Sequence, residues 1–152
     1  MKTARKQRRA PVALPKFWRP KLADGVKLDA KLIHHDLVRR LEDGTATVKD
    51  CWDWMETGFT YSQMFRLLQA DGEELTEEAE AAVAAQLESY GAICKRLREW
   101  RKVQLTKAEL ETARVATQVF DGLIDLDRNG IAVAAAEWST RQMAQLRKAM
   151  PG

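Results

Sequence analysis

Apolar residues recur at helical spacing along most of the chain, beginning near residue 28. The first such stretch covers about residues 28–43, and Gly44 follows it as a C-terminal stop. Its packing side is predicted to contain Leu28, Leu32, Ile33, Leu37 and Leu41. No alternation of apolar and polar residues typical of strands competes with this pattern, so the sequence predicts an all-α fold.

Three threonines predict where later helices begin. Thr47, Thr76 and Thr106 can each accept a hydrogen bond from a backbone amide in the first helical turn. Glu109 lies three residues after Thr106 and completes a capping box. Asn129–Gly130 predicts a helix stop. We therefore expect helices over about residues 47–70, from 76, over 106–128 and over 131–148, which together form a bundle of about five helices.

The third and fourth predicted helices each carry a single apolar stripe. These stripes are Val83, Leu87, Tyr90, Cys94 and Leu97, and Leu110, Ala113, Ala116, Phe120 and Leu123. The second helix carries two: Val48, Trp52, Met55 and Phe59, and Trp54, Tyr61, Phe65 and Leu68. A helix that is apolar most of the way round is either central or partly an interface.

Trp54 and Tyr61 therefore have two interpretations. Burial in the core is favoured, and the alternative is a partner-binding patch made of residue types that interfaces prefer. Gly58 lies between them, where glycine costs roughly 1 kcal/mol relative to alanine. That cost indicates a close approach of another helix or a neighbouring pocket.

The chain has 152 residues with a formal net charge of +3, and this charge is unevenly placed. Residues 1–22 contain eight basic residues, no acidic residue and three prolines, which leaves −5 for the remainder. Proline removes backbone donors and disfavours helix. We predict an extended basic arm at 1–22 and one helical-bundle domain at 23–150.

The arm and one later segment are the candidate binding elements. The arm is either a solvated terminus or a surface that binds nucleic acid or a protein partner, through Arg5, Lys6, Arg8, Arg9, Phe17, Trp18 and Arg19. The later segment, 95–102, contains Lys95, Arg96, Arg98, Trp100, Arg101 and Lys102. Its cations suit a helix C-terminus, and they also suit phosphate or an acidic protein surface.

Metal and cofactor sites are not expected. Asp125, Asp127, Asn129 and Gly130 match the first half of a calcium-binding EF-hand loop, but Ala136 stands where the loop needs a carboxylate, so a helix stop is favoured. His34 and His35 are neighbours and should point about 100 degrees apart on a helix, which argues against a shared ion. A composite site of His35 with Cys51 and Cys94 is less favoured than cysteines packed as small apolar residues.

Catalysis and membrane insertion are not expected either. The sequence contains no glycine-rich phosphate loop and no nucleophile elbow, so we expect a protein that is not an enzyme. No apolar run approaches the length of a spanning helix, and no signal peptide or disulfide framework is indicated. A cytoplasmic location is the default expectation.

Two short motifs carry a resemblance. Gly44-Thr45-Ala46-Thr47 followed by Asp50, and Leu105-Thr106-Lys107-Ala108-Glu109-Leu110, resemble small helical accessory proteins of proteobacterial phages, prophages and plasmids. Those proteins share a start rich in Lys, Arg and Pro. The chain departs from them at Cys51, where tryptophan is frequent, with Trp52 one step later. The resemblance implies a mobile-element accessory protein, a class that includes inhibitors of host defence.

These observations favour a non-catalytic binding protein. The preferred hypothesis is an anti-defence inhibitor, similar in manner to anti-CRISPR proteins, that binds a host protein or ribonucleoprotein complex. The alternative is an accessory protein that contacts RNA or DNA directly through the arm and residues 95–102.

Overall fold

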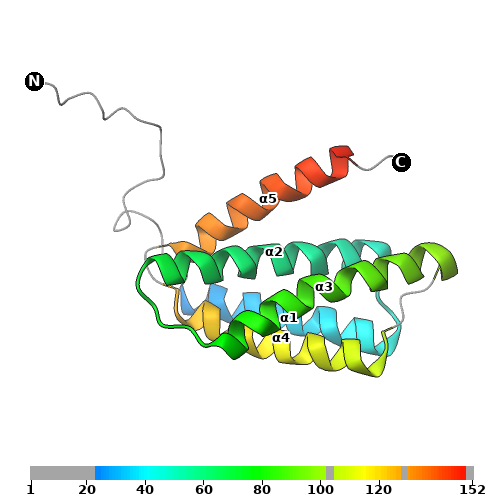
Figure 1. The fold of residues 1–152 in the computed structure, drawn as a ribbon, viewed down its shortest axis with the longest axis horizontal. Helices are drawn as coiled ribbons and strands as arrows, with labels where there is room; N and C mark the ends of the chain where they lie inside the picture. Colours follow the sequence, from blue (N-terminus) through cyan, green and yellow to red (C-terminus); the bar gives the residue numbers. More distant parts are fainter. Residues whose placement is uncertain (1–22, 102–104, 128–129, 150–152) are drawn as a thin grey trace, which may run out of the picture.

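The computed structural model describes residues 23–101, 105–127 and 130–149, and these residues form five helices without strands. The helices are α1 (Asp24–Asp43), α2 (Val48–Ala70), α3 (Glu77–Trp100), α4 (Lys107–Asp125) and α5 (Ile131–Ala149). The predicted all-helical bundle is thus confirmed (Figure 1). None of the described helices combines the length and apolar character needed to cross a membrane. The predicted arm lies outside the described residues.

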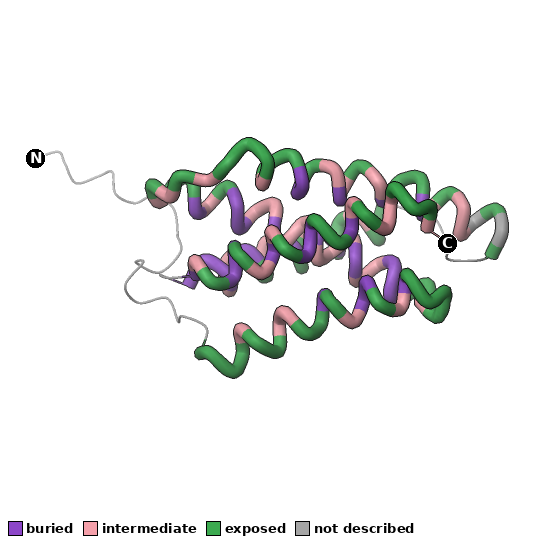
Figure 2. The backbone as a smooth tube through the Cα atoms, turned by 90° about the horizontal axis from the view of Figure 1, so that it is seen from below, coloured by how far each residue is buried: buried purple, intermediate pink, exposed green. Residues whose placement is uncertain are grey.

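α2 is the central helix of the bundle. It contacts each of the other four helices, and α4 also packs against α1 and α3. Trp54 and Tyr61 are both buried, with Tyr61 stacked on Phe120 at a ring-centroid distance of 4.3 Å. The structure therefore supports the core interpretation of these two residues, because only 1% of Trp54 and 5% of Tyr61 are exposed. Buried positions lie on the inward sides of the helices (Figure 2).

α5 packs on part of the α2 stripe that contains Val48, Trp52, Met55 and Phe59, whereas Val48 at the start of that stripe is 55% exposed. Phe59 packs edge-to-face on Trp138 of α5, and the Arg147 guanidinium lies over the Trp52 ring at 5.5 Å. Small residues of α5, including Ala135 and Ser139, are fully buried against α2. The extensive contacts of α5 are thus with α2. Toward its C-terminus, α5 diverges from the rest of the bundle (Figure 1).

The packing stripe predicted for α1 is wrong in its first half. Leu28 and Leu32 are each 57% exposed and Ile33 is 63% exposed, whereas Leu37 and Leu41 are buried as expected. At about 100 degrees per residue, Leu28 and Leu37 lie on opposite sides of the helix, so one packing face cannot cover both. His34 and Val38 complete the buried side instead.

The predicted helix starts are confirmed by their caps. Thr47 and Asp50 form a capping box at α2, and Thr106 and Glu109 form another at α4. Thr76 caps α3 by accepting a hydrogen bond from the amide of Ala79. These starts depend on contacts within one helical turn, which explains why the local sequence was sufficient to locate them. α1 begins four residues earlier than predicted, after Ala23, which provides no side-chain cap.

Gly58 marks a close approach of α2 and α3, as predicted. A Cβ at this position would meet the side-chain Oε1 of Gln86 and lie 2.7 Å from Leu87 Cδ2. Gln86 is fully buried, and its Nε2 donates to the Trp54 carbonyl at 3.0 Å. Glycine therefore leaves the space that this buried amide occupies.

Candidate functional site

A groove runs between α1 and α5, with α2 as its floor. It exists because α5 packs on α2 and makes no comparable contact with α1. Two adjoining cavities of about 420 and 390 Å³ form the groove. They share five lining residues: Ala30, Thr60, Tyr61, Ala136 and Thr140.

One wall of the groove is apolar. Val26, Ala30, Ile33 and Leu37 follow one another along α1 at helical spacing and all line the cavities. Val26 is 49% exposed, and Ile33 is 63% exposed. Val133 and Ala136 contribute apolar surface from α5. Apolar side chains that face a groove at this level of exposure are typical of surfaces that bind a partner.

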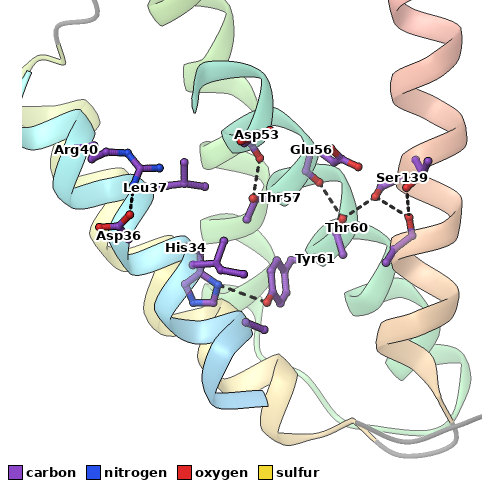
Figure 3. A pocket seen from close by; sticks show the side chains of 14 residues that line it. His34, Asp36, Leu37, Arg40, Asp53, Glu56, Thr57, Thr60, Tyr61 and Ser139 are labelled. Carbon is purple, nitrogen blue, oxygen red and sulfur yellow. Dashed lines mark hydrogen bonds and ion pairs between the residues drawn. The ribbon is translucent and has the colours of Figure 1, made fainter. Parts of the chain in front are cut away.

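The lining is acidic as well as apolar. Four acidic residues and one basic residue line the two cavities: Asp36, Asp53, Glu56, Glu137 and Arg40. Arg40 forms an ion pair with Asp36 (Figure 3). It also pairs with Asp50, and Asp53 pairs with Lys49. Glu56 and Glu137 form no ion pair with another described residue. The groove therefore presents net negative charge beside an apolar wall.

Hydroxyl groups of α2 and α5 meet on the groove floor. Thr60 Oγ1 and Ser139 Oγ share a hydrogen bond of 2.7 Å between the two helices (Figure 3). Each hydroxyl also lies within hydrogen-bonding distance of a carbonyl of its own helix, at Glu56 and Ala136 respectively. Because each hydroxyl has one proton, one of them donates to the other across the helices, and the one that accepts donates to its own carbonyl. This hydrogen bond joins α5 to α2 on the floor of the groove.

A histidine and a tyrosine extend the groove toward α4. Tyr61 Oη lies 3.4 Å from His34 Nδ1, and His34 Nε2 lies 2.7 Å from Asp121 Oδ1. Burial lowers the pKa of His34 below its usual value of 6.5, and the hydrogen bond to Asp121 opposes that effect. Burial also raises the pKa of Tyr61 above its usual value. A neutral imidazole and a neutral phenol therefore close this end of the groove at physiological pH.

The start of α1, which follows the predicted arm, and the basic end of α3 lie far apart in the bundle (Figure 1). Residue 23, which follows the arm, lies at the end of the bundle where α1 begins, and α3 ends at the opposite end (Figure 1). The predicted arm residues lie outside the described part of the chain. They are Arg5, Lys6, Arg8, Arg9, Phe17, Trp18 and Arg19.

Residues 95–102 are only partly available for binding. Lys95 is exposed, and so is Arg101, which ends α3 in a left-handed conformation with φ 56°. Arg96 pairs instead with Glu109, the carboxylate of the α4 capping box. Arg96 thus joins α3 to the start of α4. Arg98 and Trp100 belong to α3, whereas Lys102 lies outside the described residues.

The half-matched calcium motif has a structural role at its second aspartate. Asp127 is buried and accepts a hydrogen bond of 2.9 Å from the amide of Ala132 in the first turn of α5. Asp125 pairs with Lys31 of α1 at 2.7 Å.

Cys51 and Cys94 are free thiols, and burial raises the pKa of Cys51 to about 11, which disfavours its reactive thiolate form.

The sequence analysis missed the groove because it assigned the first half of α1 to the core. The exposure of Val26 and Ile33 depends on where α5 packs, and no local pattern determines that. Comparison with protein-family models, curated proteins and solved structures finds no match to this chain.

Proposed function

We propose that this protein acts by binding a partner protein rather than by catalysis. The groove between α1 and α5 receives a segment that carries both basic and apolar side chains. The observation that supports this proposal is the combination of an apolar wall, which includes exposed Ile33, with acidic side chains of α2 and α5. Apolar contact provides affinity, and charge complementarity selects a basic partner.

Basic segments with interspersed apolar and aromatic residues are characteristic of protein surfaces that bind nucleic acid. A protein that occupies such a segment competes with the nucleic acid for the same cations. The proposed role is therefore an inhibitor that blocks the nucleic-acid site of a host nucleoprotein complex. The resemblance of the sequence to accessory proteins of mobile elements suggests the same class.

Direct binding to RNA or DNA is the second candidate function. It is favoured by the eight basic residues of segment 1–22, which contains no acidic residue. Lys95 and Arg101 add exposed cations at the end of α3. In this case the arm contacts phosphates, and the affinity falls steeply as salt rises because counterions are released on binding.

An affinity experiment with groove variants separates the two functions. Ala136→Arg places a long cation in both cavities from an exposed position on α5. Ala144→Arg makes the same change at an exposed position of α5 that does not line the groove, so it is the matched control. Each tagged protein is incubated with host lysate before and after nuclease treatment, and the retained proteins and nucleic acids are identified.

The proposal requires a specific set of results. A stoichiometric protein binds to the wild type and to Ala144→Arg, is lost with Ala136→Arg, and is displaced by added nucleic acid. Recovery of nucleic acid alone before nuclease treatment, with no groove-dependent protein afterwards, supports direct nucleic-acid binding instead.

A further inference from the structure

The two histidines of the chain converge on one carboxylate on the side of α1 that packs against α4. His34 Nε2 lies 2.7 Å from Asp121 Oδ1, and His35 Nε2 lies 2.8 Å from Asp121 Oδ2. One ligand atom from each of the three side chains lies within 4.8 Å of the others. Although neighbouring positions on a helix point about 100 degrees apart, both imidazole rings turn toward the carboxylate that lies between them.

We propose that His34, His35 and Asp121 form a binding site for a divalent transition-metal ion of the zinc class. Two imidazole nitrogens and one carboxylate oxygen are a common set of three protein ligands for zinc. Such ligands lie about 2.0–2.2 Å from the ion, and hence up to about 4 Å from one another. The present separations require only small side-chain rotations to reach that geometry. Calcium and magnesium, which prefer oxygen ligands, do not suit this set.

The environment of each ligand fits this role. The His34 side chain is almost completely buried, and its other ring nitrogen faces Tyr61 Oη at 3.4 Å. When a metal occupies Nε2, Nδ1 carries the proton and donates to that phenol oxygen. A partner on the second ring nitrogen is the usual way in which proteins orient a metal-binding histidine.

The site is open to solvent on one side. The side chains of His35 and Asp121 are 47% and 30% exposed, so an ion has a path to the site and room for water as a further ligand. Lys31 is the nearby cation, and its ion pair with Asp125 directs it to a different carboxylate. Metal binding would link α1 to α4 across 86 residues of sequence, and it does not depend on the groove having a partner.

Metal titration of the purified full-length chain tests the proposal. After treatment with a chelator, the protein is titrated with Zn²⁺ by calorimetry and with Co²⁺ by visible absorption, which reports the coordination geometry. The variants are His35→Gln and Asp121→Asn. Glu111→Gln is the control, because it removes an exposed carboxylate of the same helix about 15 Å along the helix axis from Asp121. Circular dichroism of each variant establishes that it is folded.

The wild type and Glu111→Gln are expected to bind one Zn²⁺ per chain and to unfold at a higher temperature when zinc is present. His35→Gln and Asp121→Asn should each weaken binding by roughly tenfold or more, because each removes a ligand. The proposal is overturned if the wild type shows no saturable binding. It is also overturned if folded Asp121→Asn and His35→Gln bind zinc as tightly as the wild type, since the ion is then held elsewhere.

Discussion

Replacing Gly58 with alanine tests how closely α2 and α3 approach each other. In a helix interior, alanine is favoured over glycine by roughly 1 kcal/mol. Against this gain, the added methyl group displaces the buried Gln86 side chain and breaks its hydrogen bond to the Trp54 carbonyl. Leaving those polar groups unsatisfied costs about 1–3 kcal/mol, and crowding Leu87 costs about 1–3 kcal/mol more. We expect a net destabilisation of roughly 1–5 kcal/mol.

Urea unfolding followed by far-UV circular dichroism measures this effect. Gly91→Ala is the matched control, because Gly91 lies within α3 and a Cβ there meets nothing within 4 Å. It should stabilise the protein by about 0.5–1 kcal/mol. In a Gln86→Ala background, Gly58→Ala should lower the free energy of unfolding by much less, because the Gln86 side chain that the new methyl group would meet is absent. The reasoning is refuted if Gly58→Ala stabilises the protein as Gly91→Ala does, or if its cost is unchanged in the Gln86→Ala background.

Three further predictions concern a helix cap, the corrected side of α1 and the arm. Asp50→Asn should destabilise the protein by about 1–2 kcal/mol near neutral pH, since Asp50 completes a capping box and pairs with Arg40. The hydrogen bond from Arg40 lowers the pKa of Asp50 below its usual value of 3.8. The stabilisation by the Asp50 carboxylate is therefore present above pH 3.8 and is lost as the pH falls through the lowered pKa. An acid titration of Asp50→Asn should show no such loss. Leu32→Gln should change the unfolding free energy by less than about 0.5 kcal/mol, whereas Leu37→Ala should cost about 2–5 kcal/mol in the same denaturation assay. Deleting residues 1–22 should leave the helical circular-dichroism signal of the bundle intact. If the chain binds nucleic acid, the deletion should also make log affinity depend less steeply on log salt concentration. An unchanged slope would show that the arm contacts no phosphate.

Sequence reasoning was most successful where a structure depends on neighbouring residues. The starts of α2 and α4 follow from Thr47 and Thr106, which satisfy backbone amides within a single turn. The central place of α2 followed from its two apolar stripes, because one stripe alone needs one partner and two stripes need partners on both sides. Gly58 was informative for a similar reason, since an unfavourable residue inside a helix indicates a constraint from its surroundings.

Sequence reasoning failed where the outcome depends on distant residues. Leu32 and Ile33 are as apolar as Leu37, and the packing of α2 and α4 on α1 determines which of them is buried. The convergence of His34 and His35 requires Asp121, which lies on another helix. The angle between neighbouring residues on a helix describes their Cβ directions, and long side chains can bend toward a common partner. Neither the groove nor the metal-ligand cluster therefore has a local signature in the sequence.

The central claim is that the groove between α1 and α5 binds a basic protein segment. The most direct measurement is the affinity of the partner recovered from nuclease-treated lysate for the wild type, Ala136→Arg and Ala144→Arg, with and without competing nucleic acid. The account predicts that Ala136→Arg weakens binding by roughly tenfold or more, that Ala144→Arg leaves it unchanged, and that nucleic acid competes with the wild type. Equal affinity of the wild type and Ala136→Arg, or binding that nucleic acid does not affect, would contradict it.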